Sequence, residues 1–193
     1  LIALDVMGSD KGPKEILRGV DMALERGLSA KLHLVLTNGP HWHAVTEHGL
    51  HEKGVKLSIC SEDSGIRARN SSVAICAQMV RDGMADAFYS CGNTQLATFW
   101  ATSERGIGML EGFKRAPLAL VVPNRKIGQS VLLDAGANVN CSADDLVQFA
   151  KLGYSFYRTV FREAKNPVTR LLANGTEEYK GDVLIQEAAE TLR

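Results

Sequence analysis

The sequence lacks several features that would point to a particular class of protein. Its four cysteines form no C-x-x-C pair, so reduced cytosolic thiols are expected. Its 22 basic residues are balanced by 22 acidic ones, so no overall positive charge favours nucleic acid or an anionic membrane. No signal peptide and no apolar run of about 20 residues is evident. We therefore expect a cytoplasmic protein that binds no nucleic acid, with any peripheral membrane contact outside this segment.

What the sequence does contain is an alternation of short β-branched or Leu-rich runs with amphipathic stretches. The predicted strands are residues 1–6, 31–36, 55–60, 85–89, 118–122, 131–134 and 168–172. Helices are predicted to begin at Pro13 and after a capping box of Ser142 and Asp145, and to cover 41–53, 72–81, 94–103 and 182–192. With 193 residues, 45% of them hydrophobic, this order predicts a single α/β body over residues 1–193. It has a largely parallel sheet with helices on both faces.

Small or polar residues follow several of the predicted strands directly. They are Gly8 and Ser9, Asn38 and Gly39, and residues 90–94, 134–138 and 174–176. In a parallel sheet these strand ends meet along one edge, where α/β folds bind their ligands. Backbone N–H groups and helix N-termini at such an edge suit an anion such as phosphate.

Four motifs spread over nearly the whole chain resemble the phosphate:acyl carrier protein acyltransferase family. They are residues 5–10 (DVMGSD), 90–94 (SCGNT), 131–139 (VLLDAGANV) with 146–150 (LVQFA), and 175–181 (GTEEYKG). Each motif alone is a weak signal, but their common order makes the match specific.

This resemblance implies a fold related to phosphate acetyltransferases and isocitrate-type dehydrogenases, a homodimer and an active site in a cleft. It also implies transfer of a fatty acyl group from acyl carrier protein to inorganic phosphate. The product, an acyl phosphate, would be used next to acylate glycerol 3-phosphate. Family members continue well beyond Lys180, so a C-terminal part that completes the cleft is expected to be missing from this chain.

The sequence departs from the family pattern in its loops. Ser9 stands where the family has a second glycine, which adds a Cβ to the first loop. Ala173 stands where the family has asparagine, so a polar group is missing there. The segment from Glu62 to Arg67 is shorter than its family counterpart.

Two residues of the last motif are candidates for catalysis. An attack of phosphate on a thioester requires a dianion held against the carbonyl and stabilisation of the oxyanion that develops. Lys180 would neutralise the phosphate or the oxyanion, and Glu177 would position Lys180. The alternative for Lys180 is an ordinary solvated lysine on the first turn of a helix.

The remaining site candidates are assigned to phosphate or substrate binding. They are Asp5, Gly8, Asp10, Asn93, Thr94, Asp134, Gly136 and Asn138. Asn93 and Thr94 offer polar groups at a predicted helix start, where an ordinary N-cap is the alternative. Because a carboxylate repels phosphate, Asp134 is given a scaffolding role at this edge.

No metal and no cofactor is predicted. His41, His43, His48 and His51 lack the H-E-x-x-H spacing and are interpreted as a solvated helix surface. Cys91 has no adjacent histidine and is interpreted as a small buried thiol.

Scattered basic residues offer a docking patch for acyl carrier protein, which is strongly acidic. They are Arg67, Arg69, Arg105, Lys114, Arg115, Arg125 and Lys126. The alternative is plain surface charge.

Three other functions remain open at this point. A short-chain enzyme that uses coenzyme A thioesters would share the fold and the phosphate site. A dehydrogenase of the same broad fold would need a nucleotide site, and the sequence has no G-x-G-x-x-G. A catalytically silent dimeric scaffold is suggested by the altered loops at Ser9 and Ala173.

Overall fold

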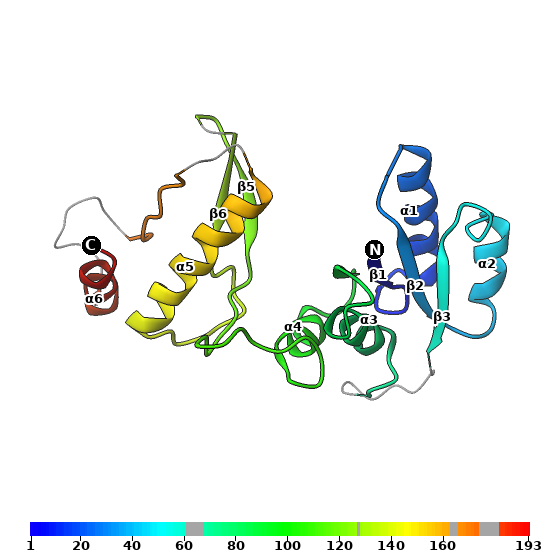
Figure 1. The fold of residues 1–193 in the computed structure, drawn as a ribbon, viewed down its shortest axis with the longest axis horizontal. Coiled ribbons are helices and arrows are strands. Elements are labelled where there is room, and N and C mark those ends of the chain that lie inside the picture. The colour runs from blue at the N-terminus through cyan, green and yellow to red at the C-terminus, as the bar shows by residue number, and fades with distance from the viewer. Residues whose placement is uncertain (61–67, 127, 163–165, 174–181) are drawn as a thin grey trace. The chain divides into compact units, whose positions relative to one another are not determined.

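The computed structural model describes residues 1–60, 68–126, 128–162, 166–173 and 182–193 (Figure 1). The chain contains two compact units, Leu1–Met109 and Leu110–Arg193. The expectation of one α/β body over the whole chain stays a prediction. Within the described residues, no helix has the length and apolar character needed to cross a bilayer.

The first unit is built on a four-stranded parallel sheet, as the sequence predicts. The strands are β1 (Ile2–Asp5), β2 (Leu32–Thr37), β3 (Lys56–Cys60) and β4 (Ala87–Ser90), in the order β3-β2-β1-β4. Because β1 lies between β2 and β4, Asp5 at its end is opposite Val35 on one side and Ser90 on the other. The carboxyl ends of β1 and β4 are therefore neighbours.

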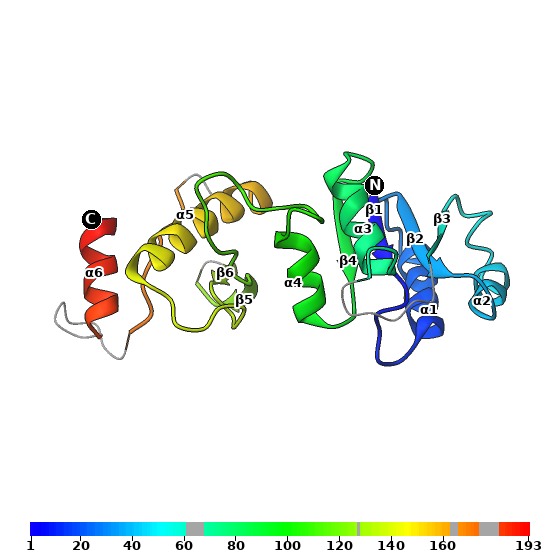
Figure 2. The same ribbon diagram turned by 90° about the horizontal axis from the view of Figure 1, so that it is seen from below.

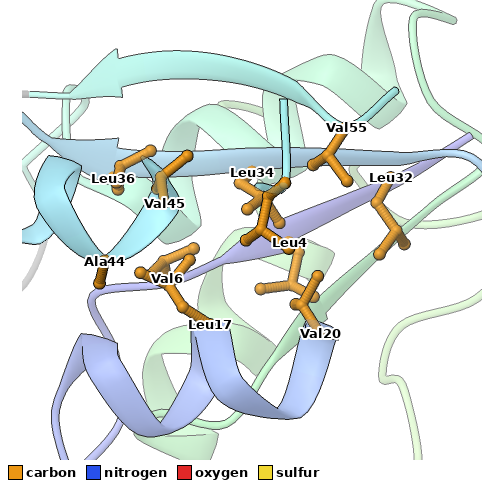
Figure 3. Close-up of a cluster of buried hydrophobic side chains, with 11 residues drawn as sticks. Leu4, Val6, Leu17, Val20, Leu32, Leu34, Leu36, Ala44, Val45 and Val55 are labelled. Carbon is orange, nitrogen blue, oxygen red and sulfur yellow. The ribbon is translucent and has the colours of Figure 1, made fainter. Parts of the chain in front are cut away.

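One face of this sheet packs against α1 (Pro13–Glu25) and α2 (His41–Glu47). Side chains alternate between the faces of a strand, so Leu4 and Val6 point to this side. They meet Leu17 and Val20 of α1 in a fully buried cluster (Figure 3). The apolar stripe that begins after Pro13 therefore forms the core of this face, as its spacing indicates.

The opposite face is covered by α3 (Ser72–Arg81), and α4 (Thr94–Thr102) packs on α3 (Figure 2). Ala3 and Val35 point to this side and meet Cys76 and Met79 of α3. Trp100 of α4 is fully buried against α3. Helices on both faces of a parallel sheet confirm the predicted fold class.

The second helix is shorter than predicted. The sequence indicates a helix over residues 41–53, but α2 ends at Glu47 and turns follow to residue 54. Gly49 has a φ of 56°, a conformation that favours glycine and commonly ends a helix. The glycine within the predicted range is the physical reason for the early end.

The second unit contains a β-hairpin and two helices. The hairpin is formed by β5 (Leu120–Asn124) and β6 (Gly128–Leu132), and the helices are α5 (Ala143–Val160) and α6 (Val183–Leu192). Helix α5 begins at the predicted capping box, in which the Ser142 hydroxyl accepts from the Asp145 N–H and the Asp145 carboxylate accepts from the Ser142 N–H. Helix α6 contacts α5.

Of the three strands predicted in this unit, two are present as β5 and β6, and the prediction at 168–172 is wrong. The strands expected at 118–122 and 131–134 pair antiparallel, because the three residues between Asn124 and Gly128 cannot form a parallel crossover, which needs about a dozen. Residues 168–172 form no strand. Val168 is 76% exposed and Leu172 is 82% exposed, so no sheet buries this apolar segment.

Candidate functional site

Asp5 joins the ends of three elements at the carboxyl edge of the parallel sheet. It is 2% exposed. Its Oδ1 accepts hydrogen bonds from the N–H groups of Met7 (3.1 Å) and Gly8 (3.2 Å) and from the Ser72 hydroxyl. Its Oδ2 accepts from the Ser90 hydroxyl at 2.7 Å. A carboxylate is tolerated in such a buried place because donors surround it, and here they fix the first loop, the start of α3 and the end of β4 together.

The loops that follow β1 and β4 touch through two glycines, Gly8 and Gly92. A Cβ added to Gly92 would lie 2.7 Å from the Gly8 carbonyl oxygen and 2.9 Å from its Cα. A Cβ added to Gly8 would lie 2.4 Å from Oδ2 of Asp5. The Gly92 N–H also donates to the Ser90 hydroxyl at 3.1 Å. This close approach of two backbones requires glycine at both positions.

Asn93 caps the helix that begins beside this contact. Its Oδ1 accepts from the N–H groups of Gln95 (2.9 Å) and Leu96 (3.2 Å). Thr94, the first residue of α4, is exposed. The N-cap alternative is therefore correct for Asn93, and it directs the positive end of the α4 dipole toward the loop at Gly92.

Ser9 is accommodated in the first loop without strain. Its hydroxyl accepts from the Lys11 N–H at 3.2 Å and its carbonyl accepts from the Gly12 N–H at 3.0 Å. Among the described residues, Asn140 is the one non-glycine residue with a positive φ, so Ser9 does not occupy the glycine conformation. Asp10 is exposed in the same loop.

Cys91 is exposed, so the interpretation as a buried thiol is wrong. It follows β4, which is the edge strand of the sheet, and the position is therefore open to solvent. Its thiol donates to the Tyr89 hydroxyl at 3.4 Å, and this hydrogen bond raises the pKa of Tyr89.

In the second unit, Asp134 organises the loop that follows β6. Its Oδ1 accepts from the N–H groups of Leu118 (2.5 Å) and Ala137 (3.2 Å), and its Oδ2 accepts from the N–H of Asn138 (2.7 Å). Burial raises the pKa of Asp134, but these backbone donors outweigh burial, so its pKa lies below the usual value. The Asp134 carboxylate therefore holds the backbone of the loop that follows β6 in place.

Gly136 and Asn138 complete this second loop. Gly136 has a φ of 109°, which favours glycine. The Asn138 side-chain amide donates to the Ala116 carbonyl at 2.9 Å, and Arg115 donates to the Val139 carbonyl at 3.2 Å. The loop is thereby fastened to the segment that precedes β5.

Comparison with known proteins shows which family this chain belongs to. The family model described as "Fatty acid synthesis protein" matches residues 1–193. The chain belongs to this fatty acid synthesis protein family. It is 35% identical to a protein of Koribacter versatilis, 36% identical to one of Pelotomaculum thermopropionicum and 35% identical to one of Thermotoga maritima, and all three are named "Phosphate acyltransferase". Each comparison covers 100% of this chain and 56–57% of the relative. The chain thus spans a little over half the length of these relatives.

The structure of this family member places the predicted site residues in two loop systems. Asp5, Gly8, Asp10, Asn93 and Thr94 lie in the first unit, at the ends of β1 and β4. Asp134, Gly136 and Asn138 lie in the second unit. The predicted catalytic residues Lys180 and Glu177 lie outside the described residues, as does Arg67 of the basic patch. Contact of any of these residues with phosphate stays a prediction.

Sequence reasoning assigned no role to three residues of this site, Ser72, Ser90 and Gly92. Ser90 and Gly92 belong to a quoted motif, so a signal for them existed. Ser72 lies 67 residues from Asp5 in the sequence, and no local sequence pattern predicts their hydrogen bond.

The histidines form no metal-like cluster in the described part of the chain, where no group of three or more His, Cys, Asp and Glu side chains is placed to hold a metal ion. His48 Nδ1 lies 3.1 Å from Asp21 Oδ2, and Lys53 forms an ion pair with the same carboxylate. This carboxylate therefore links α1 to the segment that follows α2. A site without metal or cofactor stays a prediction.

Proposed function

We propose that the protein transfers a fatty acyl group from acyl carrier protein to inorganic phosphate and releases an acyl phosphate. The observation that carries this proposal is the contact between Gly8 and Gly92 beside the capped start of α4. Relatives named for phosphate acyltransfer, each matched over the whole of this chain, support the reaction class.

Phosphate is the substrate that this part of the first unit suits best. Two loops meet at the carboxyl edge of the sheet through glycines that carry no side chain, and the α4 N-terminus adds a positive dipole end. The Asp5 carboxylate is buried beneath these loops with four internal donors. Asp5 therefore acts as a positioning residue for the loops.

The transfer requires one bond to form and one to break. A phosphate oxygen attacks the thioester carbonyl carbon, the new C–O bond forms, and the C–S bond then breaks as the carrier's thiolate leaves and takes up a proton. No acyl-enzyme intermediate is needed, because a thiolate is already a good leaving group. In this proposal Lys180 neutralises the phosphate or the developing oxyanion, and Glu177 positions Lys180.

The proposal extends to the assembly and partners of the protein. The active protein is a homodimer that acts in the cytoplasm on acyl carrier protein. Any peripheral membrane contact is made by parts outside this chain.

Product analysis tests the reaction directly. The protein, in the full length in which it occurs, is incubated with long-chain acyl carrier protein and isotopically labelled phosphate, and in parallel with the coenzyme A thioester of the same acid. We expect labelled acyl phosphate and preferred use of the carrier thioester. Consumption of thioester without labelled acyl phosphate would contradict the reaction, and preferred use of the coenzyme A thioester would favour the short-chain alternative.

The same assay tests the predicted catalytic role of Lys180. Lys180→Ala is expected to lower turnover by about tenfold or more, because charge stabilisation of the transition state is lost. Lys31→Ala serves as the matched control. Lys31 is an exposed lysine just before the amino end of β2, away from the carboxyl edge of the sheet, and its replacement is expected to leave turnover unchanged. Wild-type turnover in folded Lys180→Ala would remove Lys180 from the mechanism.

A further inference from the structure

A polar pocket of about 390 Å³ lies along α3 in the first unit. Its lining comes from the segment before α3, from one side of α3 and from the segment after α4. The pocket is large enough to hold a small molecule. The residues that line it are Arg69, Asn70, Gln78, Arg81, Glu104 and Arg105, and we call this pocket the α3 groove.

The α3 groove is separate from the loops at Gly8 and Gly92. Arg81 is the last residue of α3, and the chain then enters β4 at the amino edge of the sheet. Arg105 follows the end of α4, a helix that begins at the carboxyl edge directly after β4. A molecule in the groove therefore leaves the place proposed for phosphate open.

One of the three arginines is part of the groove's frame. The Arg81 guanidinium donates to both oxygens of Asp82, at 2.8 and 3.2 Å, and to the Arg105 carbonyl at 3.0 Å. It therefore ties the end of α3 to the segment after α4. Its charge is matched by Asp82.

The backbone that carries Arg105 is held by the end of α4. The Gly106 N–H donates to the Ser103 carbonyl at 2.9 Å, and the Ile107 N–H donates to the Trp100 carbonyl at 3.0 Å. Trp100 is fully buried against α3, and a Cβ added to Gly106 would lie 1.7 Å from the Trp100 carbonyl oxygen. This turn therefore requires glycine after Arg105, and its position is set by the core.

The backbone that carries Arg69 is held by α3. The Gln78 side-chain amide donates to the Arg69 carbonyl at 3.1 Å, and Ser71, which caps α3, donates its N–H to the Ala68 carbonyl at 3.0 Å. Arg69 and Arg105 are exposed, and neither forms an ion pair with another residue in the part of the chain that the structure describes. Two unmatched guanidinium groups on held backbone thus line one pocket, which suits bidentate pairing with acidic groups of a ligand.

We propose that the α3 groove binds a small anion that also carries hydroxyl groups. Its carboxylate or phosphate oxygens pair with Arg69 and Arg105. The Glu104 carboxylate in the same lining repels a ligand that presents negative charge alone, but it accepts a hydrogen bond from a hydroxyl. A fatty acyl chain does not suit this lining, because it would leave polar groups without partners. The site is independent of the proposed function.

Calorimetry with three probes tests the site. Citrate carries carboxylates and a hydroxyl, tricarballylate carries the same carboxylates without the hydroxyl, and ribose 5-phosphate combines hydroxyls with a phosphate. Titrations at about 0.15 M salt weaken contacts with scattered surface charges. We expect citrate or ribose 5-phosphate to bind at one site per chain, and the tighter of the two shows which acidic group is preferred. No binding by either would overturn the proposal.

The comparison of citrate with tricarballylate tests the hydroxyl. Loss of a hydrogen bond to a carboxylate is expected to weaken binding by about fivefold or more. Equal binding of the two probes would overturn the proposed selection by Glu104. A Glu104→Gln variant, which no longer repels the anion, is expected to narrow the difference between them.

Matched variants place the binding in the groove. The double variant Arg69→Gln/Arg105→Gln keeps polar side chains but removes both charges, and we expect the affinity for the tighter probe to fall by about tenfold or more. Arg26→Gln removes an exposed arginine after α1, on the other face of the sheet, and is expected to leave the affinity unchanged. Equal losses in both variants would indicate general attraction to surface charge, and undiminished binding by the double variant would place the anion elsewhere. Either result would overturn the groove proposal.

A urea titration separates the groove from the candidate phosphate site. The tighter probe is expected to raise the urea midpoint of the wild type, because a ligand that binds only the folded state stabilises it. This rise is expected to persist in Thr94→Ala, at the exposed first residue of α4, and to disappear in the double variant. Its loss in Thr94→Ala alone would assign the anion to the start of α4 and overturn the groove proposal. Failure to form acyl phosphate would overturn the proposed function and leave these binding results unchanged.

Discussion

At the scale of single residues, Asp5 is the centre of the candidate site. Its buried carboxylate accepts four hydrogen bonds from three elements, and two of the donors are the backbone N–H groups of Met7 and Gly8. Removal of one acceptor leaves a buried donor without its partner, which costs more than the net value of a hydrogen bond.

Asp5→Asn tests this arrangement. The new amide keeps the shape but replaces one acceptor oxygen with a donor, so we expect the free energy of unfolding to fall by about 2 kcal/mol in urea titrations. Asp10→Asn, at an exposed position in the same loop, is expected to change it by less than about 0.5 kcal/mol. Equal stability of both variants would show that Asp5 does not hold the loops together.

The residue scale also shows what the sequence predicts about the site and what it cannot. Gly8, Asp10, Asn93 and Thr94 are predictable because polar residues after parallel strands must meet at one edge. The hydrogen bond between Asp5 and Ser72 of α3 is not predictable from the sequence. The two residues are 67 positions apart and meet only because β1 and α3 pack together. The exposure of Cys91 likewise depends on β4 being an edge strand, which no local pattern reports.

At the scale of elements, the N-terminus of α4 is the part of the candidate site where a side-chain cap is formed. Asn93 satisfies two of the N–H groups that a helix start leaves without intrahelical partners. The cap therefore fixes where α4 begins and where its dipole is directed.

Two substitutions separate the capping role of Asn93 from its other properties. Asn93→Ala is expected to lower the free energy of unfolding by about 1 kcal/mol, whereas Asn93→Ser, which retains a capping oxygen, is expected to stay close to the wild-type value. Urea titration of the three proteins under identical conditions measures both. A serine variant as unstable as the alanine variant would contradict the capping assignment.

Elements were predictable from the sequence where a signal was local. The capping box of Ser142 and Asp145 and the start of α1 at Pro13 appear in the structure as expected. The strands now seen as β5 and β6 were predicted without their antiparallel pairing, although the short connection between them requires it. Residues 168–172 have the composition of a strand, but a strand also needs neighbours, and composition does not supply them.

At the scale of the whole molecule, the account depends on one structural claim. The loops after β1 and β4 touch at Gly8 and Gly92, and we propose that they form the binding place for inorganic phosphate, the acceptor of the acyl group. Any side chain at Gly92 forces these loops apart, since its Cβ would lie 2.7 Å from the Gly8 carbonyl oxygen. The matched change is Gly19→Ala in α1, where a Cβ meets nothing within 4 Å.

Phosphate saturation kinetics of Gly92→Ala and Gly19→Ala test this claim most directly. We predict that Gly92→Ala raises the KM for phosphate by about tenfold or more, since the displaced loops no longer shape the proposed phosphate position beside the α4 N-terminus. Gly19→Ala keeps the wild-type KM and gains about 0.5–1 kcal/mol in stability from helix propensity. A folded Gly92→Ala protein with the wild-type KM for phosphate would contradict the account.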